Sequence, residues 1–165
     1  MSKASATPLF TAETISIGTE LLIGGRSDSN SLFLADELGK LGIAVRFKSV
    51  VGDERQDIVT AIQIAVKRSQ VIVMTGGLGP TVDDCTREAV AHATGHRLGR
   101  RKEALEGMTA RLAQWGRIAH TAQLRQAMIP SSKPNWSVTY VPGLKCYQRS
   151  RSVPRGTPKR GGRGL

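Results

Sequence analysis

The strongest constraint on the fold is a short apolar run that leads directly into a glycine-rich turn. Residues 71–74 read Val-Ile-Val-Met, and residues 75–81 read Thr-Gly-Gly-Leu-Gly-Pro-Thr. A continuous apolar run of this length is typical of a central parallel strand, which is covered on both faces. A chain with such a strand needs helices on both sides of its sheet. This pattern predicts an α/β protein.

The neighbouring segments supply the other elements of such a fold. Apolar residues at 14–17 and 43–47 predict two more strands, and helical spacings lie between the strands. We expect Asn30 to cap the helix after the first strand and a helix to span 82–94 after the glycine turn. A later helix should direct Trp115 into the core. Strands that alternate with helices are joined by right-handed crossovers, so the predicted class is a three-layer α/β/α fold with a mostly parallel sheet.

Ligands of such sheets bind beyond the carboxyl ends of the strands, so the loops after residues 17 and 75 are the expected site. Glycines at 76, 77 and 79 let the backbone approach a ligand closely, and amides at the start of a following helix favour a phosphate. The turn is neither a P-loop nor a complete G-x-G-x-x-G motif. A tight turn that binds nothing is the alternative.

Four carboxylates flank these loops: Glu20, Asp28, Asp83 and Asp84. Hard oxygen ligands beside a phosphate would suit Mg²⁺. Adjacent residues on a helix point about 100° apart, so Asp83 and Asp84 cannot both face one ligand. Thr81 and Asp84 also have the spacing of a helix cap, which leaves one Asp structural and the other free for a metal or a water. Solvated loop acids are the alternative for the whole set.

The formal net charge of +11 is concentrated at the C-terminal end. Residues 144–165 hold 7 of the 24 Lys and Arg and none of the 13 Asp and Glu, so the remainder carries +4. We therefore divide the chain into a domain at 13–143 and a disordered basic tail at 144–165, which would contact polyanions non-specifically. No uncharged run is long enough to cross a membrane. Two cysteines are too few for a disulfide framework, which favours the cytoplasm.

Several motifs in order make the sequence resemble a known family. They are Ile17-Gly18-Thr19-Glu20-Leu21-Leu22-x-Gly24, Asp28-x-Asn30, Val50-Val51-Gly52-Asp53, Thr75-Gly76-Gly77-Leu78-Gly79-Pro80-Thr81-x-Asp83-Asp84-x-Thr86 and Arg125-Gln126-Ala127-x-Ile129-Pro130. Together they resemble the N-terminal domain of the competence/damage-inducible protein A (CinA) family. That domain belongs to the molybdopterin-binding, MoaB/MogA-like superfamily.

The resemblance implies a function and a set of site residues. CinA-like domains are associated with a metal-dependent pyrophosphatase that converts ADP-ribose to AMP and ribose 5-phosphate. The pterin-handling branch instead binds molybdopterin, so a pterin-binding protein without hydrolysis is the alternative. We expect a homo-oligomer, a Mg²⁺ or Co²⁺ ion held by Asp83, Asp84, Glu20 and Asp28, and catalysis by Asp83 and Asp84. The expected ligand-binding residues are Gly18, Thr19, Glu20, Asn30, Thr75, Gly76, Gly77, Gly79 and Thr81.

After about Ser132 the sequence departs from the family pattern. The family continues with an Asn-Pro-x-Gly-x-Ala-Pro-Gly segment, another strand and a helix, whereas this chain runs through Pro142-Gly143 into the basic tail. A frameshift or truncation would produce such a change. It would remove at least one strand and part of the ligand pocket, so an inactive fragment is the third possibility.

Overall fold

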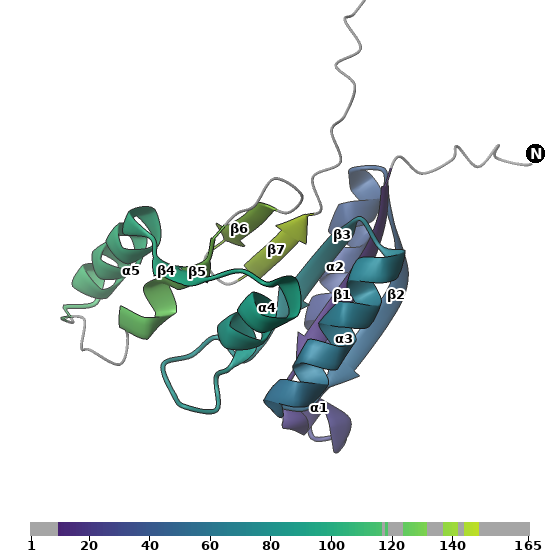
Figure 1. Ribbon diagram of the computed structural model, residues 1–165, viewed down its shortest axis with the longest axis horizontal. Helices are drawn as coiled ribbons and strands as arrows, with labels where there is room; N and C mark the ends of the chain where they lie inside the picture. The colour runs from purple at the N-terminus through teal and green to yellow at the C-terminus, as the bar shows by residue number, and fades with distance from the viewer. Residues whose placement is uncertain (1–9, 117, 119–123, 132–136, 142–143, 149–165) are drawn as a thin grey trace, which may run out of the picture.

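Three parallel strands form the centre of the structure, a computed structural model that describes residues 10–116, 118, 124–131, 137–141 and 144–148. They are β1 (Phe10–Ile17), β2 (Ile43–Val51) and β3 (Val71–Thr75), in the spatial order β2-β1-β3 (Figure 1). All three were predicted as strands, although β1 and β2 are longer than their apolar segments. Because the strands are parallel, their carboxyl ends meet at one edge of the sheet.

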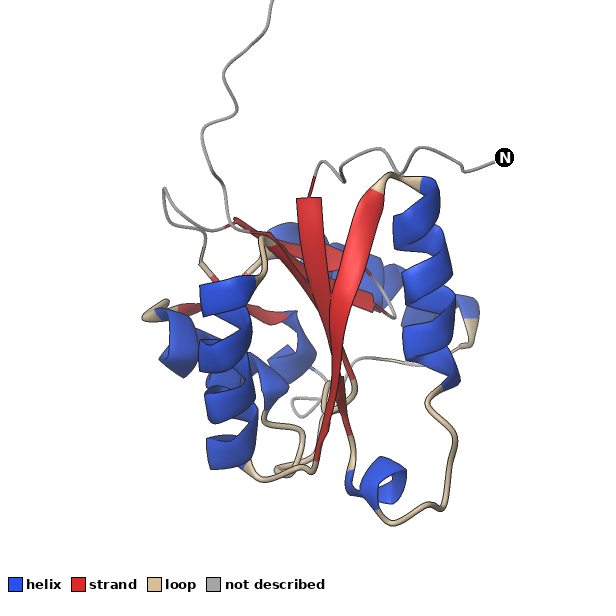
Figure 2. Ribbon diagram, turned by 90° about the vertical axis from the view of Figure 1, so that its right-hand side faces the viewer, coloured by secondary structure: helices blue, strands red, loops and turns tan. Residues whose placement is uncertain are grey.

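Helices cover both faces of these strands, as Figure 2 shows with the sheet seen on edge. One face carries α2 (Ser29–Lys40), and the other carries α3 (Arg55–Arg68) and α4 (Thr86–Thr94), which pack against each other. The predicted three-layer α/β fold with a parallel sheet is therefore confirmed for this part of the chain.

The alternation of side chains along β3 explains why its apolar run is continuous. Ile72 and Met74 pack in the core cluster that contains α3 and α4. Val71 and Val73 pack on the opposite face in the cluster that contains Leu34 of α2. Successive side chains of a strand point to opposite faces, so a strand between two helical layers needs apolar residues at every position.

Two antiparallel strands extend the sheet on the other side of β3. They are β6 (Ser137–Val141) and β7 (Leu144–Gln148), and β7 pairs with β3 to complete the order β2-β1-β3-β7-β6. The predicted domain boundary at residue 143 is therefore wrong, because residues 144–148 belong to the sheet. Residues 144–148 mix apolar and polar residues, and this short segment gives no periodic pattern that would predict a strand. Residues 149–165, the rest of the predicted tail, lie outside the described residues.

A smaller antiparallel pair lies beyond α4. It joins β4 (Leu98–Arg100) to β5 (Met128–Pro130), with α5 (Lys102–Gln114) and the 3₁₀ turn η1 (Arg125–Ala127) beside it. The prediction that Trp115 faces the core is wrong, because its side chain is 66% exposed. Trp115 follows the last residue of α5, so it no longer shares the helix face that carries the buried Ala104 and Leu112.

Two predicted helix starts also need correction. Asp28, and not Asn30, caps α2, because its carboxylate accepts the N–H of Ser31 at 3.0 Å. The helix α4 begins at Thr86 instead of residue 82. Among the described residues, no helix combines the length and apolar character needed to cross a membrane.

A buried carboxylate lies inside the sheet, away from its carboxyl edge. Glu13 on β1 is 0% exposed, and it accepts hydrogen bonds from Ser49 on β2 and from Arg68 at the end of α3. The two bonds from the guanidinium are 2.9 and 2.8 Å long, and the guanidinium also lies 3.8 Å from the ring centroid of Phe47. This pairing raises the pKa of Arg68. Arg68 therefore neutralises a charge that the sheet buries.

Replacing Arg68 with Met should lower the free energy of unfolding, because it leaves the Glu13 carboxylate buried and uncompensated. Urea unfolding at neutral pH measures this loss. The exposed neighbour Lys67 gives the matched control, since Lys67→Met should change stability by less than about 0.5 kcal/mol. Equal effects of the two substitutions would contradict this role of Arg68.

Candidate functional site

The carboxyl ends of β1 and β3 flank a cavity of about 340 Å³. From β1 the chain passes through α1 (Thr19–Leu22) to α2 on one face, and from β3 it passes to α4 on the other. This divergence is the topological switch point at which open α/β sheets bind ligands. The cavity is lined by Ile17, Glu20, Leu21, Arg26, Ser27, Asp28, Ser29, Asn30, Thr75 and Gly76. The two predicted loops therefore meet at one site.

The backbone of Gly76 approaches the end of β1 more closely than any side chain would allow. Its φ is 91°, and a Cβ atom at this position would lie 1.8 Å from the carbonyl oxygen of Ile17. Gly77 has a φ of 59° and would place a Cβ 2.3 Å from the hydroxyl of Thr86. Glycine is thus required at both positions for steric and conformational reasons. Its predicted role in bringing backbone close to a ligand remains a prediction.

Asp28 connects the end of β1 to the start of α2. Besides the cap on Ser31, its carboxylate accepts the hydroxyl of Ser16 at 2.8 Å. Partial burial by itself raises the pKa of Asp28, but the hydrogen bonds from Ser31 and Ser16 outweigh it, and the pKa falls below its ordinary value. Asp28 is therefore ionised at neutral pH and faces the cavity.

Asp53, which our site prediction omitted, holds together the loops that follow all three parallel strands. Its carboxylate accepts both the N–H and the hydroxyl of Thr19, at 2.9 and 2.8 Å. Its carbonyl accepts the thiol of Cys85, in the loop before α4, at 3.3 Å. The signal was present in the sequence, because Val-Val-Gly-Asp at 50–53 ends the second strand at the same sheet edge.

Asp84 closes the glycine-rich loop and does not lie on a helix. Its carboxylate accepts the N–H of Thr81 at 2.9 Å and the Thr81 hydroxyl at 2.5 Å. Burial raises the pKa of Asp84, but the hydrogen bonds from Thr81 and Gly79 outweigh it and lower the pKa. The Thr86 N–H, at the start of α4, bonds to the carbonyl of Gly77. The chain therefore makes a compact loop where we predicted the first turn of the helix.

The predicted site residues separate into two groups. Glu20, Asp28, Asn30, Thr75 and Gly76 line the cavity. Seven others are not among its lining residues: Gly18, Thr19, Gly77, Gly79, Thr81, Asp83 and Asp84. Arg26, Ser27 and Ser29 line the cavity and were missed, although they lie in the predicted loop.

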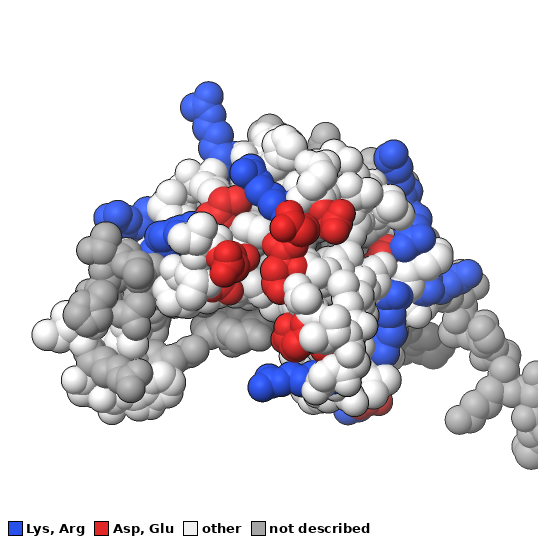
Figure 3. Space-filling view, turned by 90° about the horizontal axis from the view of Figure 1, so that it is seen from below, with Lys and Arg blue, Asp and Glu red and all other residues white. Residues whose placement is uncertain are grey.

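The predicted cluster of four carboxylates does not form as a unit. In the part of the chain that the structure describes, no three His, Cys, Asp or Glu side chains converge on a point that could hold a metal ion. Seen from the end that carries α1, Asp and Glu side chains gather near the middle of the surface and Lys and Arg lie around them (Figure 3). The cavity itself is lined by two carboxylates, Glu20 and Asp28, and by the guanidinium-bearing Arg26.

A protein-family model matches almost the whole of the chain that the structure describes. The family model described as "Probable molybdopterin binding domain" matches residues 13–149. The chain belongs to this family. The match continues past Ser132, where we had placed the departure from the family pattern, and it includes β6 and β7.

Curated relatives place the chain among CinA-like proteins. The CinA-like protein of Synechococcus elongatus is 42% identical over 146 residues, which cover 87% of this chain and 34% of that protein. The CinA-like protein of Gloeothece citriformis is 43% identical over 138 residues, covering 82% of this chain and 33% of that protein. The chain thus spans about a third of the length of the curated relatives it matches.

Solved structures agree with this placement. The crystal structure of the protein CinA from Thermoplasma acidophilum, described as having unknown function, superposes with a TM-score of 0.65 at 33% identity. The alignment covers 78% of this chain and 73% of that one. The tungsten cofactor synthesizing protein MoaB from Pyrococcus furiosus superposes with a TM-score of 0.52 at 25% identity, covering 67% and 66%. The CinA and MoaB/MogA-like resemblance is confirmed.

Replacing Gly76 with Ala should lower the free energy of unfolding by at least about 3 kcal/mol more than replacing Gly24 with Ala. Both glycines have a positive φ, so both substitutions carry a backbone cost of about 1–2 kcal/mol. Only Gly76 would also clash, because a Cβ at Gly24 meets nothing within 4 Å. Thermal and urea unfolding of the two variants measure the difference, and similar losses would contradict the contact with Ile17.

Replacing Asp28 with Ala should cost about 1–2 kcal/mol of stability at pH 7, because the α2 cap and the bond from Ser16 are lost. The lowered pKa means that the folded protein binds the Asp28 proton less readily than the unfolded chain. The difference between wild type and variant should therefore shrink as the pH falls below 3.8, the ordinary value, and through the folded pKa. Urea unfolding from pH 7 to pH 3 tests this, with Asp36→Ala on the exposed side of α2 as the control.

Proposed function

We propose that the cavity between β1 and β3 binds the diphosphate of ADP-ribose and that the protein hydrolyses it to AMP and ribose 5-phosphate. One observation carries this proposal: the cavity combines a cation and polar donors with carboxylates at the switch point of the sheet. Arg26 and Asn30 can donate to phosphate oxygens, and Ser27 and Ser29 add hydroxyls. The confirmed CinA resemblance supplies the substrate class.

The residues present fit a divalent metal ion that arrives with a diphosphate. Glu20 and Asp28 give the cavity carboxylate oxygens, which are the ligands that Mg²⁺ prefers, and Co²⁺ can take similar donors. Mg²⁺ commonly takes only one or two protein carboxylates and completes its coordination with substrate phosphates and water. The absence of a three-residue cluster in the described chain is compatible with that arrangement. When bound, such an ion would offset the charge that develops on the phosphoryl oxygens.

We assign different tasks to the two adjacent aspartates. Asp84 is bonded to Thr81 and keeps the loop closed, which leaves its carboxylate committed to the backbone. Asp83 is exposed, so its carboxylate is open to solvent beside the loop. In hydrolysis a water oxygen forms a bond to one phosphorus, the bond from that phosphorus to the bridging oxygen breaks, and a base takes the water proton. Glu20, which lines the cavity, is the proposed base, and a catalytic role for Asp83, which does not line it, stays a prediction.

A pterin is the second candidate ligand, and the family match favours it. The matching model is described as a probable molybdopterin binding domain. The same cavity would then bind the phosphate of a pterin and the protein would catalyse no hydrolysis. Release of AMP from ADP-ribose separates the two candidates. The expected homo-oligomer, and contact of the basic tail with polyanions, stay predictions.

Replacing Glu20 with Gln should lower kcat/KM for ADP-ribose by about 100-fold, because it removes a negative charge and a base from the cavity. The assay measures AMP and ribose 5-phosphate released in the presence of Mg²⁺ or Co²⁺. Glu103→Gln on the exposed side of α5 is the matched control and should leave the rate unchanged. A wild-type protein that binds a pterin but releases no AMP would support the second candidate, and E20Q with wild-type kinetics would remove Glu20 from the mechanism.

A further inference from the structure

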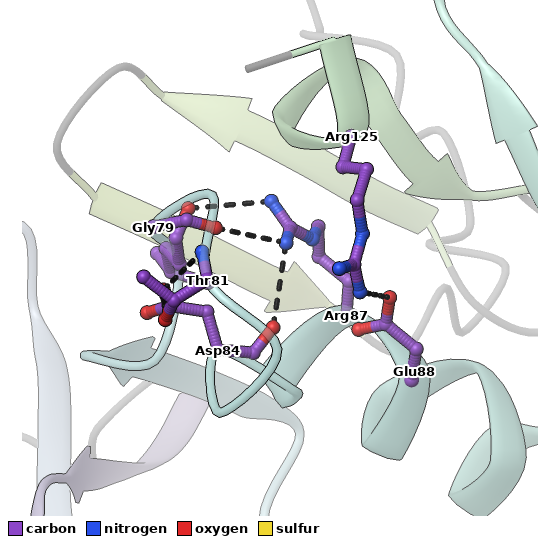
Figure 4. A network of polar contacts seen from close by, with 7 residues as sticks. Gly79, Thr81, Asp84, Arg87, Glu88 and Arg125 are labelled. Carbon is purple, nitrogen blue, oxygen red and sulfur yellow. Dashed lines mark hydrogen bonds and ion pairs between the residues drawn. The ribbon is translucent and has the colours of Figure 1, made fainter. Parts of the chain in front are cut away.

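A buried arginine holds the glycine-rich loop from behind. Arg87, in the first turn of α4, is 1% exposed and is the largest fully buried side chain among the described residues. Its guanidinium donates to the carbonyl oxygens of Leu78 at 3.2 Å, Gly79 at 3.1 Å and Asp84 at 3.3 Å. Figure 4 shows this guanidinium between α4 and the loop. One side chain thus fixes the loop near both of its ends.

These contacts place carbonyl oxygens of the loop on the side of Arg87 and backbone N–H groups on the opposite side. In a trans peptide the C=O and N–H point in opposite directions, and the described chain contains no cis peptide. The Leu78 carbonyl that faces Arg87 therefore turns the Gly79 N–H away from it. The next peptide has no N–H, because residue 80 is proline. Carbonyls face α4 as a result, and donors face the opposite side.

The donor side already binds an oxyanion within the protein. The N–H and hydroxyl of Thr81 donate to the Asp84 carboxylate, and the Gly79 N–H also lowers the pKa of that carboxyl. A second residue supports the carbonyl side, since the Gln126 amide donates to Leu78 at 3.3 Å. The Asp84 carboxylate thus takes the donors on one side of the loop, and Arg87 and Gln126 take the carbonyls on the other, so the loop has one fixed shape.

The burial of Arg87 is costly if stability is its only purpose. A guanidinium taken out of water loses hydration, and neutral carbonyls compensate a charge less well than a carboxylate pair does. Within the described residues its Nε also has no hydrogen-bond partner. Local arrangements that break the rules of good packing occur preferentially at functional sites.

We propose that Arg87 is a positioning residue that fixes the glycine-rich loop and thereby holds Thr75 and Gly76, which begin this loop and line the cavity, in place for the anionic ligand. The inference rests on the proposed function for the identity of that ligand, ADP-ribose. Arg87 touches the loop backbone and not the substrate, so its effect passes through the loop. It should therefore act on substrate binding more than on the chemical step.

The test compares Arg87→Gln and Arg87→Lys with the wild type. In R87Q we expect the KM for ADP-ribose to rise at least tenfold with kcat changed less than threefold. R87K keeps a cation that can reach fewer carbonyls, so its KM should lie three- to fivefold above the wild-type value. Amide exchange of Thr81 and Thr86, which bond to Asp84 and Gly77, should become at least tenfold faster in R87Q, while amides of β1 exchange as in wild type.

Arg125→Gln is the matched control. Arg125 lies near Arg87 in Figure 4 but pairs with Glu88 at 3.6 Å, and among the described residues no hydrogen bond joins its side chain to the loop. Its substitution should leave KM and the loop amides within twofold of wild type. The proposal is overturned if folded R87Q keeps the wild-type KM and exchange rates, or if R125Q changes them equally. If R87Q does not fold, a wild-type KM in R87K overturns it.

The two proposals can fail separately. A wild-type protein that does not hydrolyse ADP-ribose refutes the proposed function and leaves the exchange rates of Thr81 and Thr86 as the measurement that decides for Arg87. A purely structural arginine would lower the unfolding temperature of R87Q without changing KM in the folded protein. Local loss of protection at the loop, with rescue by Lys, supports positioning.

Discussion

The approach of the Gly76 backbone to the Ile17 carbonyl determines where the rest of the molecule can place its chemistry. It brings the ends of β1 and β3 together at the point where the chain leaves them toward opposite faces of the sheet. A side chain at Gly76 would separate the two ends, and the cavity that they flank would change shape. The apolar side chains of β3 support this approach of the two strand ends, because they pack on helices of both layers and hold β3 beside β1.

Most of the carboxylates at this edge of the sheet hold loops in place. Asp28 joins β1 to α2, Asp53 joins the loops after β1 and β2, and Asp84 closes the glycine-rich loop. Each accepts a backbone N–H group, and this hydrogen bond orders the loop that donates it. The site thus depends on carboxylates in two ways. Some shape it, and Glu20 lines the cavity with a carboxylate that we propose acts on the ligand.

How far the sequence predicted the site depended on the range of the interactions involved. The two loops were expected to meet because they follow parallel strands, and Glu20, Asn30, Thr75 and Gly76 do line one cavity with Asp28. The predicted start of α4 was wrong. Thr81 and Asp84 have the spacing of a helix cap, but they bond to each other within a loop that precedes the helix. The hydrogen bonds that join Asp53 to the neighbouring loops were not predicted, because its partners, Thr19 and Cys85, are distant in sequence.

By itself the sequence determined the α/β class, the three parallel strands and the edge at which to look for a ligand. Those features follow from the periodicity of apolar residues and from the glycines that come directly after the strands, and both can be read from neighbouring residues of the chain. Only the tertiary structure decided that residues 144–148 pair with β3, that Arg87 is buried beneath the loop, and which carboxylates remain open to a ligand. These depend on contacts between segments far apart along the chain, where no spacing rule applies and packing selects the partner.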